Sequence, residues 1–252
     1  MPSDPTGPPD DAVPTVLLVD DSAHVTDLFA AALESSLGCR VRTLTSPREL
    51  TDELLATERF AVAVVDLSFG SDTESGLDAL LRLHLRSPET RLTILTQGDA
   101  WVADMLRDAV EILPIAAALS KSNPVERQIS TIDQVLRNGY AAPDPILVPL
   151  LPSAPDKRRT IDSFARLVQH RGHAKLWAAV LACGPGAEYQ DLAAHSGLRP
   201  NALRNYRAQL LPELVVHGLR NPPMRDLHAF AQRCRPFLAP FVEAKGITLD
   251  IV

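Results

Sequence analysis

The stretch VLLVDDS, from Val16 to Ser22, runs from four apolar residues straight into two adjacent carboxylates and a serine. A short apolar run of this kind is typical of a buried strand. Asp20 and Asp21 repel each other at such close range, so a positive group is expected beside them. The alternative is that the two aspartates only cap the helix that follows. The rest of the chain should hold the positive partner if the first interpretation is right.

Four further apolar runs follow in the first half of the chain, at residues 41–45, 60–68, 91–96 and 115–121. Between and after them, apolar residues recur at helical spacing, which predicts helices at 23–37, 46–58, 75–86 and 123–139. Ser22, Ser46 and Asn123 are the expected N-caps. Strands that alternate with helices predict an α/β domain whose parallel sheet is covered on both faces.

Polar side chains stand where these strands end. Asp20 and Asp21 follow the first strand, Asp66 ends the third, Thr96 the fourth and Lys121 the fifth. Ligands bind at the carboxyl ends of strands in such sheets, so these side chains should converge. Clustered carboxylates favour a hard cation such as Mg²⁺, and Lys121 is the positive partner that the opening stretch requires. Asp66, on the central strand, is then a candidate carboxylate nucleophile for a phosphoryl group.

The motifs VDDS, VVDLS, LTILTQ and LSKS, in this order within residues 14–140, resemble the receiver domain of two-component response regulators. The resemblance implies a flavodoxin-like, doubly wound, five-stranded parallel sheet. It implies that a sensor histidine kinase phosphorylates Asp66. Mg²⁺ would be held by Asp21, with Asp20 and the Ser68 backbone carbonyl in support. Thr96 and Lys121 would contact the phosphoryl group, and autodephosphorylation is the only catalysis expected, so the chain is not predicted to be an enzyme.

Several positions depart from the pattern of that family. The loop after Asp66, LSFGSDTESG, has no proline and is long. Gln97 replaces the usual small residue after Thr96, and Ala118 stands where an aromatic residue that turns inward is frequent. Pro124 comes later than the proline that usually follows the lysine. These changes predict slow phosphorylation or an altered response, and they leave open a pseudo-receiver that works unphosphorylated.

The two halves of the chain differ in charge. Residues 1–149 carry 23 acidic and 11 basic side chains, whereas residues 150–252 carry 8 acidic and 14 basic ones. A Pro-rich stretch at 141–160 separates them and is predicted to be a linker. A basic second half, residues 161–252, is a candidate for nucleic-acid binding. Its charge is alternatively that of an ordinary solvated surface.

Within the second half, residues 189–214 predict a helix-turn-helix. Gly197 suits the turn, Pro200 suits a first helical turn, and Leu203, Leu210 and Leu211 point inward. The second helix would enter the major groove of double-stranded DNA, with Arg204 and Asn205 reading base edges. The candidate DNA-binding residues are Arg199, Asn201, Arg204, Asn205, Arg207, Ala208 and Gln209, and Lys175 is a further candidate for a phosphate contact.

Residues 172–214 resemble the DNA-binding domain of the NarL/FixJ (LuxR-type) response regulators, on the motifs HAKLWAAVLACGPG and DLAAHSGLRPNALRNYRAQLL. The resemblance implies a homodimeric transcription regulator that binds paired half-sites. Arg207 departs from it, because an apolar residue is usual there. The closing segment 224–244 is longer than that family's short last helix and contains Pro236 and Pro240. Arg207 and this closing segment favour the alternative of a scaffold whose C-terminal helices bind a protein.

The remaining features are less specific. Residues 1–13 predict a disordered, Pro-rich leader that is not a secretion signal, and no apolar run is long enough for a membrane span. The three cysteines have no metal-ligand spacing and the seven histidines form no catalytic motif, so packing or surface roles are predicted. A cytoplasmic location is the simplest expectation.

Overall fold

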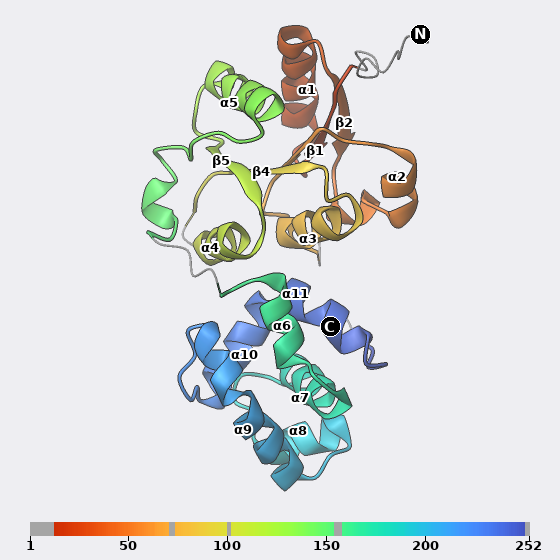
Figure 1. Ribbon diagram of the computed structural model, residues 1–252, viewed down its shortest axis with the longest axis vertical. Helices are drawn as coiled ribbons and strands as arrows, with labels where there is room; N and C mark the ends of the chain where they lie inside the picture. The colour runs from red at the N-terminus through yellow and green to blue at the C-terminus, as the bar shows by residue number, and fades with distance from the viewer. Residues whose placement is uncertain (1–12, 71–73, 100–101, 154–157, 250–252) are drawn as a thin grey trace, which may run out of the picture.

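The computed structural model describes residues 13–70, 74–99, 102–153 and 158–249, and it divides into two parts stacked along the long axis (Figure 1). The first part holds a β-sheet between two layers of helices, and the described residues of the second part are helical or irregular. This is the order of architectures that the alternating pattern in the first half and the helical periodicity in the second half predict.

The sheet has five parallel strands in the order β2-β1-β3-β4-β5. Their bounds are β1 Thr15–Val19, β2 Arg40–Leu44, β3 Val62–Val65, β4 Arg91–Thr96 and β5 Ile115–Ser120. This is the flavodoxin-like doubly wound order, which confirms the predicted fold class of the first half. All four residues of β3 are buried, because helices cover both faces of the sheet.

Five α-helices cover the sheet: α1 Ala23–Leu37, α2 Asp52–Thr57, α3 Gly76–Arg86, α4 Ala103–Ile112 and α5 Val125–Asn138. Figure 1 shows α1 and α5 on one face, and α3 and α4 on the face that looks toward the second part. The sequence pattern had not indicated α4.

Two of the predicted helices differ from the structure near their starts. The segment predicted as one helix at 46–58 is divided into two. Ser46 caps a short 3₁₀ helix, Pro47–Glu49, as predicted, and α2 begins separately after Thr51, whose side chain accepts from the Leu54 N–H. The N-cap of α5 is Pro124 instead of Asn123. Ser22 is the N-cap residue of α1, but its side chain makes no capping hydrogen bond.

The second part contains six α-helices in its described residues. They are α6 Ile161–Leu167, α7 Arg171–Ala182, α8 Tyr189–Ser196, α9 Pro200–Val216, α10 Met224–Arg233 and α11 Arg235–Glu243. The predicted closing helix is thus two helices that meet at Cys234. Pro236 lies in the first turn of α11, where a proline is tolerated, whereas Pro240 lies inside that helix. Trp177, Phe164, Phe230 and Phe237 are completely buried between these helices.

The two parts pack against each other through α3 and α4 on one side and α10, α11 and the start of α6 on the other. One cluster of buried apolar residues runs from the sheet through α4 into the helical part. Among the described helices, none combines the length and apolar character that crossing a membrane requires.

Candidate phosphoacceptor site and exposed helix face

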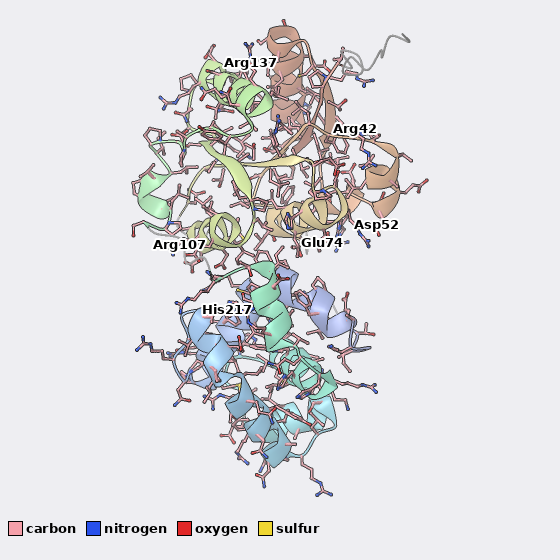
Figure 2. All side chains as sticks on the ribbon, in the orientation of Figure 1. Arg42, Asp52, Glu74, Arg107, Arg137 and His217 are labelled. Atoms are coloured by element: carbon pink, nitrogen blue, oxygen red, sulfur yellow. The ribbon has the colours of Figure 1, made fainter. Side chains whose placement is uncertain are left out.

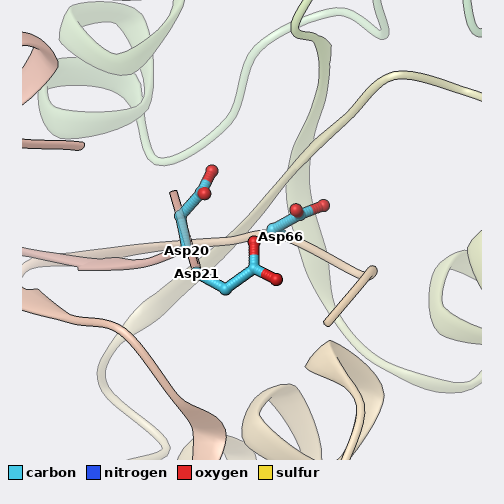
Figure 3. Close-up of side chains that lie close together, drawn as sticks. All are labelled: Asp20, Asp21 and Asp66. Atoms are coloured by element: carbon cyan, nitrogen blue, oxygen red, sulfur yellow. The ribbon is translucent and has the colours of Figure 1, made fainter. Parts of the chain in front are cut away.

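Three carboxylates gather at the carboxyl ends of β1 and β3. Asp20, Asp21 and Asp66 each offer an oxygen within 4.8 Å of the others (Figure 3). Asp20 and Asp66 are buried, at 4% and 5% exposure, whereas Asp21 is exposed. Parallel strands β1 and β3 are neighbours in the sheet, so the residues that follow them must lie side by side. The convergence predicted from the strand ends is therefore present.

Lys121 supplies the positive charge that the carboxylates need. Its Nζ lies 2.6 Å from Oδ2 of Asp20 and 2.7 Å from Oδ2 of Asp66. The Lys121 backbone N–H donates to the carbonyl of Thr96 at 2.9 Å, which fixes the end of β5 against the end of β4. Lys121 is therefore the positive group that the adjacent carboxylates of VLLVDDS were expected to need.

The environment shifts the pKa values of this pair. Burial raises the pKa of Asp66 above its ordinary value, although Lys121 opposes the shift by its hydrogen bond and its charge. Burial alone would lower the pKa of Lys121, but its hydrogen bonds and charge interactions with Asp20 and Asp66 outweigh burial and raise it. Lys121 therefore remains a cation at neutral pH and can neutralise an anion placed beside Asp66.

Thr96 is 1% exposed and stands at the end of β4, next to β5. Its Oγ1 accepts a hydrogen bond from the Gly98 N–H at 3.3 Å. Because the hydroxyl accepts this bond, its own proton is available for another acceptor. The Gln97 side chain, which the sequence marks as a departure, belongs to an exposed residue.

The loop after Asp66 contacts the same cluster. The Ser68 N–H donates to Oδ1 of Asp66 at 3.2 Å, and the Gly70 N–H donates to Oδ2 of Asp21 at 3.2 Å. Gly76, at the start of α3, lies so close that a Cβ there would be 1.8 Å from the Asp66 carbonyl oxygen. Residues 71–73 of the long loop lie outside the described residues. The metal-binding role expected for the Ser68 carbonyl stays a prediction.

The donor set suits a hard cation. Lys121 contacts Oδ2 of Asp20 and Oδ2 of Asp66. Oδ1 of each carboxylate accepts one backbone N–H, from Ser22 and Ser68, and keeps a further lone pair, while Asp21 is exposed. Carboxylate oxygens are the ligands that Mg²⁺ prefers, together with water and phosphate. The residues present thus fit the cation that the sequence predicts.

The predicted helix-turn-helix segment consists of α8, a turn through Gly197 and α9. Gly197 has φ of 67°, the left-handed conformation expected for glycine there. Of the inward residues, Leu203 and Leu210 are buried, and Leu211 is partly buried. The candidate DNA-binding residues that are exposed are Arg199, Asn201, Arg204, Asn205, Ala208 and Gln209.

Two arginines of α9 differ in their surroundings. Arg204 lies over the Tyr189 ring at 4.8 Å and donates to Asn201 Oδ1 at 2.9 Å, so its side chain is held on the exposed face. Arg207 is partly buried and donates to the Tyr189 hydroxyl, to Asn221 and to the Pro222 carbonyl. Arg207 therefore ties α9 to the segment before α10, which accounts for a charged residue on the inner side of the helix.

Sequence reasoning missed an ion-pair network between the two parts. Asp108 of α4, at 2% exposure, contacts Arg159 and Arg233, and Arg159 also contacts Glu111. The only signal in the sequence was a run of acidic residues along 104–111, which any solvated helix face could carry. The expected packing role of the cysteines fits Cys39 and Cys234, which are buried, while Cys183 is partly exposed.

Comparisons with known proteins find similar solved structures for about half of the chain. No protein-family model and no curated protein matches the chain. Among solved structures, the response regulator DrrB of Thermotoga maritima, described as an OmpR/PhoB homolog, is 19% identical, with a TM-score of 0.42 over 51% of this chain and 55% of its own. The match therefore spans about half of DrrB.

A CheY-like receiver domain protein from Methanospirillum hungatei is 16% identical with a TM-score of 0.43, covering 50% of this chain and 96% of its own. A structure named adenylate cyclase, from Rhodopirellula baltica, is 20% identical with a TM-score of 0.44, covering 50% and 89%. These similarities cover the N-terminal half, so the resemblance of the second half to NarL/FixJ regulators stays a prediction. The first half has the flavodoxin-like fold of receiver domains, which its strand order shows by itself.

Proposed function

We propose that the chain is a response regulator that accepts a phosphoryl group on Asp66 and controls transcription by binding DNA through α9. The observation that carries the first half of the proposal is Lys121, bridged between Asp20 and Asp66 at the carboxyl edge of the sheet. A cation beside a buried carboxylate, with the carboxylates of Asp20 and Asp21 close by, is suited to phosphoryl transfer. Catalysis of that reaction depends mainly on positioning the groups and on neutralising the charge of the phosphoryl oxygens.

In this mechanism an Asp66 oxygen attacks the phosphorus of a phosphohistidine on a sensor histidine kinase. The O–P bond forms as the P–N bond breaks, and the histidine leaves with the electron pair of that bond. Lys121 neutralises the charge on the phosphoryl oxygens, and the Thr96 hydroxyl donates to one of them. Mg²⁺, held by Asp20, Asp21 and Asp66, would supply further neutralisation of that charge.

A groove beside the site supports docking of the kinase. It has a volume of about 450 Å³, lies along α1 and α5, and is lined mainly by apolar side chains such as Leu28, Phe29 and Val125. Leu28 is 76% exposed although it is a large apolar residue, and Lys121 forms part of the groove wall. An apolar helix of the kinase packed there would lie next to the phosphoacceptor edge.

The DNA-binding half of the proposal rests on the exposed face of α9. That helix lies at the end of the molecule farthest from the sheet in Figure 1, so the docked first part does not cover it. Arg204 and Asn205 are the side chains proposed to read guanine and adenine edges, with Arg199 on a phosphate. Arg207 donates to Asn221 and to the Pro222 carbonyl, so it is not proposed as a DNA contact. A homodimer would place two such helices on half-sites about one helical turn apart.

A scaffold that binds a protein partner is the second candidate. The observation that favours it is the same commitment of Arg207, together with the docking of α10 and α11 on the first part, which removes these helices from a dimer contact. In that case the exposed face of α9 would bind protein, and its affinity for DNA would be weak.

Phosphorylation is tested by intact-mass measurement after incubation with acetyl phosphate and Mg²⁺. The wild type should gain one phosphoryl group, and Asp66→Asn should gain none. Asp27→Asn removes an exposed carboxylate of α1 and serves as the matched control, so it should be phosphorylated like the wild type. Absence of the modification in the wild type would refute the phosphoacceptor role and would favour a pseudo-receiver.

DNA binding is tested by anisotropy titrations at several salt concentrations, first with a randomised duplex pool and then with selected sequences. Affinity should fall with salt with a slope of about −0.9 per neutralised phosphate. Arg204→Ala should weaken the selected site by about 1–3 kcal/mol and relax its sequence preference. Arg225→Ala, on the exposed side of α10, is the control and should change neither. A salt-independent affinity would contradict DNA binding.

A further inference from the structure

The segment that follows α5 does not leave the first part as a free linker. Residues 141–151, here named the linker latch, run beside the edge strand β5. The Ala141 N–H donates to the Ala116 carbonyl at 2.9 Å, and the Asp144 N–H donates to the Ala118 carbonyl at 3.1 Å. The latch therefore occupies the hydrogen-bonding edge that β5 would otherwise expose.

Asp144 fastens the latch to the loop that carries Lys121. Its carboxylate is 5% exposed and accepts hydrogen bonds from the Ser120 N–H, at 3.2 Å, and from the Asn123 side-chain amide. The other carboxylate oxygen accepts from the Ile146 N–H at 3.0 Å. Because Ser120 and Asn123 flank Lys121 in the chain, Asp144 is bound to the loop on one side of the phosphoacceptor site.

Leu147 fastens the latch to the loop that follows Thr96. It is completely buried, and a Cβ on Gly98 would lie 2.9 Å from its Cδ2 and 3.3 Å from Cδ1 of Leu150. Gly98 is the residue whose N–H donates to the Thr96 hydroxyl. Leu147 thus lies directly behind the peptide that holds Thr96 in its present position.

Ala118 is the β5 residue whose carbonyl accepts the Asp144 N–H, and its side chain is a buried methyl group. The sequence marks this position as one where an aromatic side chain is frequent in the resembled family. The β5 strand therefore carries a small side chain at the point where the latch is bonded to it.

We propose that the linker latch senses the phosphorylation state of the site from outside the sheet. The proposal rests on the proposed function, because it takes the Thr96 hydroxyl as a donor to the phosphoryl group. When Thr96 turns toward that group, the Gly98 N–H loses its acceptor, the loop shifts, and the contact between Gly98 and Leu147 opens. The latch then loosens, and it directly precedes the segment that leads to the second part.

Hydrogen exchange on the full chain tests the first consequence. The measured amides are those of Asp144, Leu147, Leu150 and Leu151, which donate within the latch or to β5. With acetyl phosphate and Mg²⁺ their exchange should accelerate by about tenfold or more, and in Asp66→Asn it should not change. The intact mass of the same sample reports the fraction phosphorylated. Unchanged exchange in a phosphorylated sample overturns the latch, whereas an unmodified mass overturns the phosphoacceptor role instead.

A second experiment needs no phosphorylation. Leu147→Ala should accelerate hydrogen exchange of the Gly98 amide by about tenfold. Without the Leu147 side chain, the local opening that exposes this amide breaks fewer buried contacts and so costs less free energy than in the wild type. Ile146→Ala is the matched control, because Ile146 is the neighbouring residue and is 49% exposed. Leu147→Met retains the volume and should exchange like the wild type. Equal exchange at Gly98 in the two alanine variants overturns the coupling, whatever the phosphorylation result.

Discussion

Arg159 is the side chain whose removal should most weaken the contact between the two parts. Its guanidinium lies 2.5 Å from Asp108 Oδ1 and 2.5 Å from Glu111 Oε2, and the residue is 8% exposed. Burial alone would lower its pKa, but the charge of Asp108 and the hydrogen bonds to Asp108 and Glu111 raise it above the usual value. Arg159 is therefore a buried cation that holds two carboxylates of α4.

Removal of one partner from such a group leaves buried charge without compensation, which typically costs about 3–5 kcal/mol. Asp108 retains Arg233, whose Nε lies 2.9 Å from Oδ2 of Asp108, so the lower end of that range applies. We expect Arg159→Ala to reduce the free energy of unfolding by about 3 kcal/mol. For a chain of this size this corresponds to a melting temperature lower by about 6–12 °C.

The assay is thermal unfolding followed by far-ultraviolet circular dichroism, with Arg59→Ala as the matched control. Arg59 makes an ion pair of similar length, 2.9 Å to Glu89, but the two side chains are 71% and 52% exposed. Exposed pairs contribute about 0–1 kcal/mol, so Arg59→Ala should lower the melting temperature by less than about 4 °C. Added salt should weaken the effect of Arg59 more than that of Arg159.

Equal shifts in the two variants would refute the reasoning, because burial would then not distinguish the two arginines. The shape of the thermal unfolding transition is a second test of the role of this network. One apolar cluster crosses the interface, so the wild type should unfold in a single transition. A separate early transition in Arg159→Ala alone would show that the network holds the two parts together.

Two further predictions concern buried residues at other places in the fold. His217 lies in the helical part (Figure 2) and packs against Phe164 and Phe230; burial, with the charge of Arg159, lowers its pKa to about 4. As pH falls below about 6.5, His217 therefore binds a proton in the unfolded chain before it does so in the folded one. The free energy of unfolding should drop by about 2 kcal/mol between neutral pH and pH 5. Denaturant titrations should show a smaller drop in His217→Phe, and an identical drop would contradict a role of His217 in it. Gly76→Ala should lower the melting temperature and slow phosphorylation, because the new Cβ would collide with the Asp66 carbonyl. Gly70→Ala is the control and should behave like the wild type in both measurements, because a Cβ on Gly70 would have no atom within 4 Å.

Local features of the sequence were sufficient to predict the sheet and the cluster of carboxylates and Lys121 at its edge. Short apolar runs that end in Asp20, Asp66, Thr96 and Lys121 predict their own convergence, because parallel strands deliver their carboxyl ends to one edge. The same holds for the turn at Gly197, since only the conformation at one residue is at issue. Neither inference needs knowledge of residues distant in the chain beyond the order of the strands.

Other features depend on contacts that no local pattern encodes. The sequence pattern did not indicate α4, and only the structure shows that α10 and Arg159 cover its acidic residues. Arg207 was predicted to contact DNA, and the structure shows instead that it is bonded to the Asn221–Pro222 segment. The composition of the Pro-rich residues 141–151 likewise predicts a linker, and it reveals neither the unpaired edge of β5 that they cover nor the burial of Leu147. The sequence by itself determined which groups meet at the carboxyl edge of the sheet. Only the tertiary structure decided which charges are buried and where the linker lies, because burial is a property of what packs against a residue and not of the residue itself.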